Sequence, residues 1–387
     1  MGGFFCGKSG IQTHGTARPY AGFRVRSIRS LWHLSWFRRQ RYTKTIQHNQ
    51  FLYRFVLLNI QHNYEEKMKT KAIILTTILF LVLPSALLAQ GNRLPKCETY
   101  TFVERDSALK LDVYRPEQPR QDKAAVMTVF GGGFFSGERN NREMKQWAQA
   151  LLERGFTVIS IDYRLGFKDS AMVASHSKLL QLTGLFRFCI DIATEDCAAA
   201  VAWVCSNAQM LDIDPSKLIL TGSSAGAITV LQLDYCRANS LEQASALPEG
   251  WKPVAVVPYS GGIMCHKSEL KYATDPAPTM LMHGKKDKIV AYKSFGLPFS
   301  SKMFGSKKVD KAMNRQDIPH WFISFDDIGH EVAIWLPGSI DLFCSFVNLT
   351  LEGRITTLDA DMTDSNLKPA RWAQMSMLQL YGGKNKR

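Results

Sequence analysis

Residues 222–226, with the sequence GSSAG, constrain the fold of this chain more than any other feature. The apolar run 217–221 before them predicts a buried strand, and the small and apolar residues that follow predict a helix beginning at Ala225. The chain must then turn sharply at Ser224, and the flanking glycines let strand and helix approach without side-chain clashes. Such a turn lifts the Ser224 hydroxyl to a helix N-terminus, where the helix dipole favours negative charge. The pattern nominates Ser224 as a nucleophile, with a purely structural glycine-rich turn as the alternative.

Three further motifs surround this turn in the sequence. Upstream, residues 130–134 (FGGGF) end an apolar run that predicts a strand, and their glycines let backbone N–H groups approach a substrate. Downstream, Asp287 follows a short predicted strand over 279–282, and His330 lies in the loop after a predicted strand over 321–325. A hydroxyl, an imidazole and a carboxylate are the groups that nucleophilic catalysis combines. Asp287 is therefore the candidate acid and His330 the candidate base.

Neighbouring residues offer alternatives for these roles. Asp326 or Asp327 could act as the acid in place of Asp287, which would then be an ordinary turn residue. His283 precedes a glycine at a strand end and is expected to be structural. Ser223 is excluded as the nucleophile by its offset from the glycine pair.

In this order, the four motifs resemble those of the α/β-hydrolase superfamily, most closely its carboxylesterase and hormone-sensitive-lipase-like branch. Members of that branch carry a G-x-S-A-G nucleophile elbow and an H-G-G-G oxyanion loop. The resemblance covers about residues 98–347. It implies an α/β fold with a mostly parallel sheet, helices on both faces, a catalytic triad and an oxyanion hole of backbone N–H groups. The residues implied are Ser224, Asp287 and His330 for the triad and Gly132, Gly133 and Ala225 for the oxyanion hole.

The oxyanion loop departs from the family pattern at its first position. The family usually has a histidine there, whereas this chain has Phe130. That histidine usually orients the loop without donating to the oxyanion, so the change bears on loop geometry more than on activity.

The predicted elements alternate between strands and helices, as a parallel sheet covered on both faces requires. An opening hairpin is predicted over 99–104 and 109–114. Further strands are predicted over 124–130, 157–162, 217–221, 254–259, 279–282 and 321–325, and helices over 140–154, 191–208, 225–236, 289–303 and 331–348. The segment 166–190 interrupts the alternation and forms either a cap or acyl-pocket wall or an extended lead-in to the next helix. Residues 354–387 show no strong pattern.

The formal net charge of +14 raises the question of a nucleic acid or an anionic membrane as partner. Most of the charge lies at the N-terminus. Residues 1–67 hold 11 Lys or Arg against 2 Glu, and Lys69 and Lys71 add two more, so residues 91–387 keep a net charge of only +3. A nucleic-acid role is therefore not expected.

The stretch 68–90 has the anatomy of a secretory signal peptide: a basic start, an apolar run over 72–83 and Ala89 before the expected cleavage site. The apolar run is shorter than the roughly 20 residues of a spanning helix, which favours a cleaved signal over a membrane anchor. An internal signal indicates that residues 1–67 come from a misassigned start, with a targeting segment as the alternative. We expect a non-native or disordered extension over 1–67, a signal peptide over 68–89, a hydrolase domain over 90–350 and a tail over 351–387. The protein would be secreted or periplasmic, without a stable membrane span.

Cysteines and cofactors add little to this interpretation. Seven cysteines follow the expected cleavage site, an odd number, so at least one thiol stays unpaired within the chain. No two of them form a C-x-x-C pair, which argues against a structural zinc site. The chemistry that the resemblance implies needs neither a metal nor an organic cofactor.

The resemblance implies a serine carboxylester hydrolase that cleaves small or carbohydrate-linked acyl esters through an acyl-enzyme. Two alternatives stay open: a serine peptidase of the same fold, and a catalytically inactive hydrolase-fold protein that binds a partner. The inactive proteins usually lack a triad member, whereas all three candidates are present here.

A chain that begins at Gln90 is expected to fold and to hydrolyse the same esters with the same kcat/KM as the full chain. The reason is that residues 1–67 lack the periodic apolar pattern that would offset the entropy of ordering them. N-terminal sequencing of the protein exported by its native host should start at or near Gln90. A mature chain that keeps residues before Met68, or a loss of activity on their removal, would contradict this expectation.

Overall fold

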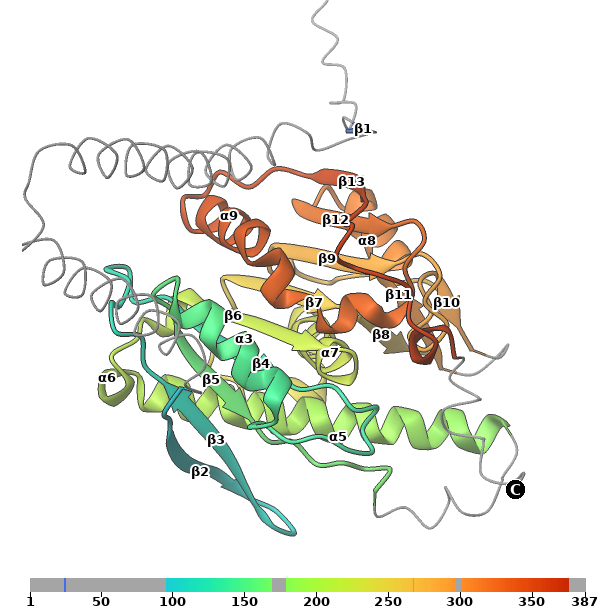
Figure 1. The fold of residues 1–387 in the computed structure, drawn as a ribbon. Coiled ribbons are helices and arrows are strands. Elements are labelled where there is room, and N and C mark those ends of the chain that lie inside the picture. The colour runs from blue at the N-terminus through green and yellow to red at the C-terminus, as the bar shows by residue number, and fades with distance from the viewer. Residues whose placement is uncertain (1–23, 26–94, 169–178, 267, 297–300, 376–387) are drawn as a thin grey trace, which may run out of the picture.

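The computed structural model describes residues 24–25, 95–168, 179–266, 268–296 and 301–375. Their main sheet has ten strands in the order β1-β13-β12-β9-β7-β6-β4-β5-β3-β2 (Figure 1). From β1 to β5 in this order, each strand pairs in parallel with the next. At the other end of the sheet, β3 pairs antiparallel with β5, and β2 pairs antiparallel with β3. The expected mostly parallel α/β fold is confirmed. The expected extension (1–67) and signal peptide (68–89) lie outside the described residues, apart from Arg24 and Val25.

In the middle of the chain strands alternate with helices, with additional short helices between some of them. The strands are β1 (Arg24–Val25), β2 (Glu98–Glu104), β3 (Ala108–Tyr114), β4 (Ala125–Val129), β5 (Thr157–Ile161), β6 (Leu218–Ser223), β7 (Ala255–Tyr259), β8 (Gly262–Cys265), β9 (Thr279–Gly284), β10 (Ser294–Phe295), β11 (Lys302–Gly305), β12 (His320–Phe325) and β13 (Leu358–Met362). The α-helices are α3 (Arg142–Leu152), α5 (Leu179–Ser206), α6 (Ala208–Leu211), α7 (Ala225–Ala238), α8 (Ser306–Arg315) and α9 (Ile340–Leu351). Short 3-10 helices are η2 (Pro215–Lys217), η3 (Glu242–Ala244), η4 (His330–Ile334), η5 (Leu336–Ser339) and η6 (Trp372–Gln374).

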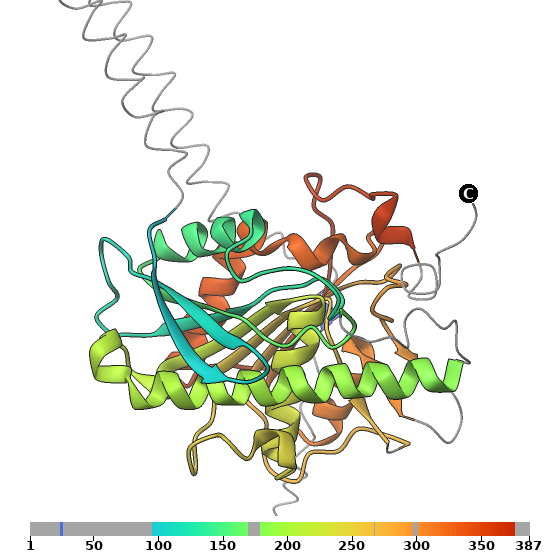
Figure 2. The ribbon, with the colours of Figure 1, turned by 90° about the horizontal axis from the view of Figure 1, so that it is seen from below.

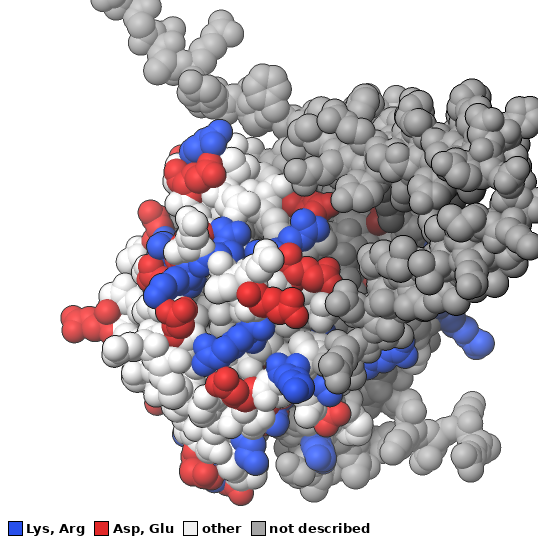
Figure 3. All heavy atoms as spheres, turned by 60° about the vertical axis from the view of Figure 1, so that its left-hand side comes forward, with Lys and Arg blue, Asp and Glu red and all other residues white. Residues whose placement is uncertain are grey.

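Helices cover both faces of the sheet, as expected. Figure 2 shows α3 on one face and the long helix α5, with α7, on the other. Helix α5 has 28 residues, yet no helix among the described residues is both long and apolar enough to cross a membrane. The face of the molecule in Figure 3 mixes acidic and basic side chains and has no large patch of a single sign.

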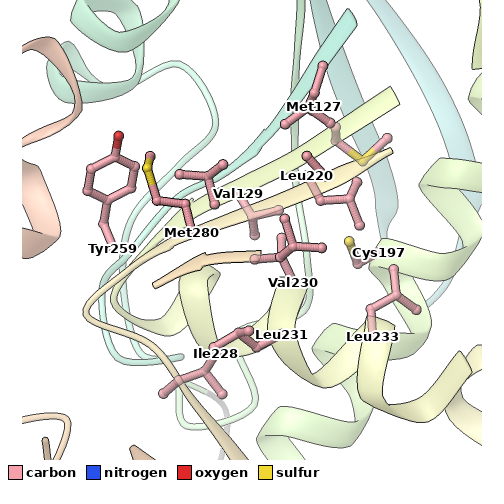
Figure 4. Close-up of a cluster of buried hydrophobic side chains, with 14 of the residues drawn as sticks. Met127, Val129, Cys197, Leu220, Ile228, Val230, Leu231, Leu233, Tyr259 and Met280 are labelled. Atoms are coloured by element: carbon pink, nitrogen blue, oxygen red, sulfur yellow. The ribbon is translucent and has the colours of Figure 1, made fainter. Parts of the chain in front are cut away.

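The centre of the core lies between the middle strands, α7 and α5. Every residue of α7 except Arg237 is buried, as is typical of a helix packed on all sides. Figure 4 shows Val230 and Leu233 of α7 near Leu220 of β6, with Cys197 of α5 close by. Fully burying one such Leu or Val side chain contributes about 1.5–3 kcal/mol. The apolar run before the GSSAG turn and the helix after it are therefore what hold the turn in place.

No disulfide links the seven cysteines of the described residues. Cys197 is fully buried, and burial raises the pKa of its thiol to about 12. It packs as a small apolar side chain in α5.

The prediction of a helix over 289–303 is wrong. The chain instead forms β10 and β11, and β11 pairs antiparallel with β8 in a separate three-stranded sheet. Gly296 and Pro298 lie in this stretch, and a proline inside a helix removes an N–H donor and clashes with the preceding turn. The missed helix, α8, begins at Ser306 and buries an apolar face at helical spacing: Val309, Ala312 and Met313.

Two other helices begin elsewhere than predicted. In place of one helix over 331–348, the chain forms η4 and η5, and α9 starts only at Ile340, after Pro337 and Gly338. Helix α5 begins at Leu179, so residues 179–190 of the interrupting segment are helical and not an extended lead-in. The ring centroids of Phe186, in this part of α5, and Phe134 are 5.7 Å apart. This contact connects α5 to the glycine loop, residues 130–134.

The boundary predicted at residue 350 leaves out one strand of the sheet. β13 pairs in parallel with β12, from Trp321 opposite Leu358 to Phe325 opposite Met362. Ala360 and Met362 are buried, whereas Asp361 between them is exposed, an alternation typical of a strand with one buried face. Five residues with two aspartates gave too weak an apolar pattern for prediction.

The turn between β6 and α7 fixes the position of the candidate nucleophile. Ser224 has φ 50° and ψ −111°, a conformation that residues other than glycine rarely adopt. A Cβ atom on Gly222 would overlap the backbone of Gly226, and one on Gly226 would overlap the carbonyl oxygen of Val129. Helix α7 therefore packs directly against β6 and β4, and this contact holds Ser224 in its strained conformation.

Replacing Gly226 by alanine is expected to destabilise the fold by about 1–3 kcal/mol, because the added methyl group must displace β4 or α7. Gly184→Ala is the matched control: Gly184 lies in α5 with open space around it, so the change should stabilise the fold by roughly 0.5–1 kcal/mol. Denaturant unfolding of both variants measures the two changes. Equal stability of the Gly226→Ala variant and the wild type would contradict the packing argument.

Candidate active site

The three residues nominated for the triad follow three strands of one sheet. Ser224 follows β6, Asp287 follows β9 and His330 follows β12. These strands run parallel, with only β7 between β6 and β9, so their carboxyl ends lie at the same edge of the sheet. Parallel pairing thus brings together residues that are far apart in the sequence.

The side chains form a continuous chain of hydrogen bonds. The Oγ of Ser224 lies 2.7 Å from the Nε2 of His330, and the Nδ1 of His330 lies 2.7 Å from the Oδ2 of Asp287. His330 and Asp287 are buried, with 4% and 6% of their surfaces exposed. An ionised Asp287 accepts the Nδ1–H, which leaves Nε2 to accept the Ser224 proton.

Asp287 is held by contacts to both of its oxygens. Its Oδ1 accepts the backbone N–H groups of Ile289 and Val290, at 2.9 and 3.0 Å. Its Oδ2 faces His330 and, at 3.3 Å, the Nε2 of His283. Burial by itself would raise the pKa of Asp287, but the two histidines outweigh it and hold that pKa well below its usual range. The carboxylate is therefore ionised at neutral pH.

The alternative acids do not contact His330. Asp327 forms an ion pair with Lys286 at 2.8 Å, and Asp326 forms one with Lys285 at 2.6 Å. Both carboxylates are largely exposed, with side-chain exposures of 81% and 55%. Asp287 is thus the carboxylate that the fold brings to the imidazole.

His283 lies behind this carboxylate and is completely buried. Its Nδ1 lies 2.8 Å from the Oγ of Ser306, and its Nε2 lies 3.0 Å from the carbonyl oxygen of Val290. These contacts connect the Asp287 loop to the start of α8. His283 contacts the carboxylate of Asp287. Among the described residues it forms no direct hydrogen bond with Ser224.

The glycine loop lies directly against the β6–α7 turn. A Cβ atom on Gly131 would lie 3.0 Å from the Oγ of Ser223 and 3.3 Å from the Cβ of Ser224. Gly132 and Gly133 have φ angles of 118° and 66°, which glycine adopts without strain. Ala225 is the first residue of α7, where backbone N–H groups lack partners within the helix. The loop therefore packs against the turn that carries Ser224, and α7 begins directly after that turn.

Phe130 is buried in a structural role. Its ring stacks on that of Tyr163, with 4.4 Å between centroids, and the Tyr163 hydroxyl donates to the Phe130 carbonyl oxygen at 3.0 Å. The loop that begins here is thus anchored by aromatic packing, where a histidine would anchor it through its ring nitrogens.

Glu143, in the first turn of α3, is a residue near the site that no sequence motif marks. Burial raises the pKa of its carboxyl group, and a hydrogen bond with Ser223 and the charge of His330 oppose that rise. One of its oxygens, Oε1, is buried without a hydrogen-bond partner among the described residues. The position of α3 in the fold brings this carboxyl group near Ser223 and His330.

The sequence patterns also do not mark Glu331 or the C-terminal segment as parts of the site. The buried Glu331 carboxylate accepts the backbone N–H of Gly329 at 2.7 Å and that of Ala370. The Trp372 ring makes a T-shaped contact with the His330 ring, with 6.2 Å between centroids. Part of the expected tail therefore lies at the site. Within the described parts of the chain, no group of three or more His, Cys, Asp or Glu side chains is placed to hold a metal ion.

Parts of the sequence are similar to a known protein family and to known esterases and lipases. The BD-FAE family profile matches residues 111–176 and 188–247, which include the glycine loop and the elbow. The chain is 29% identical over 173 residues to esterase E4 of Myzus persicae and 29% identical over 159 residues to hormone-sensitive lipase of Bos taurus. These matches cover 43% and 40% of this chain, but only 27% and 17% of the two relatives.

Among solved structures, esterase 2 of Thermogutta terrifontis aligns with 68% of this chain and 97% of its own, at 17% identity and a TM-score of 0.48. The strand order found here, the elbow at Ser224 and the sequence matches together support an α/β-hydrolase fold similar to that of esterases and lipases.

Proposed function

We propose that the protein is a serine carboxylester hydrolase with Ser224 as nucleophile, His330 as general base and Asp287 as the acid of the triad. The observation that carries this proposal is the buried hydrogen-bond chain from Ser224 through His330 to Asp287. Esterases and lipases among the sequence relatives support ester substrates.

The proposed reaction begins when the Ser224 hydroxyl attacks the ester carbonyl while His330 Nε2 takes its proton. Asp287 stabilises the imidazolium that forms and keeps the imidazole in the required tautomer. His330 then donates the proton to the leaving alcohol, and the acyl group stays on Ser224. A water molecule, activated by the same imidazole, hydrolyses this acyl-enzyme.

The negative charge that develops on the carbonyl oxygen would be stabilised by the backbone N–H groups of Gly132, Gly133 and Ala225. Each donor in such a site is worth roughly 2.7–4 kcal/mol of transition-state stabilisation. The contact of Gly131 with the elbow supports this assignment, since it holds the loop beside Ser224.

The narrower proposal is that the substrates are small or carbohydrate-linked acyl esters and that the protein acts after export through the signal peptide at 68–89. The resemblance to the carboxylesterase branch supports the substrate class, and the basic and apolar pattern of 68–90 supports export. A panel of p-nitrophenyl and methyl hydroxycinnamate esters tests the acyl specificity.

The Ser224→Ala variant is expected to lose both ester hydrolysis and labelling by a fluorophosphonate probe, because the attacking oxygen is gone. Ser223→Ala is the matched control: it changes the adjacent serine, whose hydroxyl lies outside the hydrogen-bond chain, and should still be labelled. Mass spectrometry of the labelled peptide identifies the modified serine. Labelling of the Ser224→Ala variant would refute the proposed nucleophile, and an unlabelled, inactive wild type would favour a binding protein.

The Asp287→Asn variant is expected to fold and to lose on the order of 10⁴ in kcat, because the amide favours the wrong imidazole tautomer. Asp327→Asn removes an exposed carboxylate near the same loop and should leave kcat within a factor of about two. Steady-state kinetics of the two variants decides between the acids. A normal kcat for Asp287→Asn together with a collapse for Asp327→Asn would transfer the role to Asp327.

A further inference from the structure

The C-terminal segment after β13 reaches the triad and is fixed there. In Figure 1 this dark red part of the chain runs from β13 along the carboxyl ends of the strands. The carboxylate of Glu331 binds it by accepting the N–H of Ala370 with one oxygen and that of Gly329 with the other. Gly329 also lies close to the segment, since a Cβ atom there would be 2.8 Å from the carbonyl oxygen of Ala373. Of the two residues adjacent to His330, Glu331 therefore binds this segment and Gly329 packs against it.

Trp372 is the residue of this segment that faces the triad. Its ring stands almost perpendicular to the His330 ring, at 85° and 6.2 Å between centroids. The side chain is nevertheless 44% exposed, so a large part of the indole is open to solvent beside the imidazole.

Other exposed apolar side chains belong to segments that carry site residues. Of the six large apolar side chains that are exposed among the described residues, three are of this kind: Phe135, Ile334 and Trp372. Phe135 follows the glycine loop, and its N–H donates to the Gly132 carbonyl oxygen. Ile334 is the last residue of η4, which begins at His330. Single exposed apolar residues are common, but several of them on the segments that carry site residues favour a surface for an apolar ligand group.

We propose that Trp372 is a specificity-determining residue that contacts the alcohol part of the ester and favours alcohols that carry an aromatic ring. This inference rests on the proposed hydrolase function. His330 Nε2 must come within about 3 Å of the leaving oxygen to protonate it. A ring attached to that oxygen through one carbon then lies within reach of an indole 6.2 Å from the imidazole. Aromatic rings prefer stacked or edge-to-face contacts at 4.5–7 Å between centroids.

The test compares two esters that share the acetyl group and have leaving alcohols of similar acidity, benzyl acetate and methyl acetate. For the Trp372→Ala variant of the full chain, the benzyl-to-methyl ratio of kcat/KM should fall roughly two- to tenfold, the range that one aromatic contact supplies. Trp372→Phe should restore most of the ratio. Met210→Ala is the control, since Met210 is equally exposed, at 47%, but lies on α6, away from the triad.

Several outcomes would overturn the inference. One is an unchanged benzyl-to-methyl ratio in Trp372→Ala, whether the variant keeps the activity on both esters or loses it equally on both. A changed preference for methyl phenylacetate over methyl acetate, with the benzyl-to-methyl ratio intact, would move the contact to the acyl group. Fluorophosphonate labelling and methyl acetate hydrolysis of the wild type distinguish a failure of the proposed hydrolase function from a failure of the role proposed for Trp372. If both are absent, the proposed function fails and the inference with it, whereas normal values for both with an unchanged ratio reject the role of Trp372 alone.

Discussion

The close contact between α7 and β4 at Gly226 is the constraint on which the site depends. Because Gly226 lies against the Val129 carbonyl oxygen, the first turn of α7 is pressed onto the sheet and Ser224 adopts φ 50°. Strain of this kind costs about 1–3 kcal/mol and persists only where the surrounding packing outweighs it. The burial of almost all of α7 supplies that packing. The glycine loop follows β4 directly, so the same contact also sets its distance from Ser224.

The buried carboxylate of Asp287 depends on a second set of contacts. A charge removed from water is costly unless it is paired and hydrogen-bonded. Two backbone N–H groups meet one oxygen of Asp287, and His330 and His283 meet the other. Since the folded-state pKa of Asp287 lies below that of the unfolded chain, its ionised form stabilises the fold above the unfolded pKa. This stabilisation is lost as the pH falls through the folded-state pKa.

The candidate site draws residues both from the part of the chain that the family profile matches and from later segments. The BD-FAE match covers the glycine loop and Ser224, whereas Asp287, His330 and Trp372 all lie beyond residue 247. Glu331, next to His330, connects Gly329 on the other side of His330 to Ala370 in the C-terminal segment. A rigid sheet thus positions the reacting groups, while the segments at its carboxyl edge surround them, which is where specificity usually resides in such folds.

The sequence by itself determined the features that depend on local backbone geometry: the elbow, the glycine loop, the opening hairpin and the order of Ser224, Asp287 and His330. Glycine spacing and strand periodicity are properties of a few adjacent residues, so they can be recognised without the fold. Only the tertiary structure separates Asp287, which contacts His330, from the aspartates at 326 and 327, which pair with lysines, because the three differ in position and not in local pattern. It also decided that β13 completes the sheet and that Glu143, Glu331 and Trp372 lie at the site. These residues owe their positions to contacts between segments far apart in the chain, and no local pattern encodes such contacts.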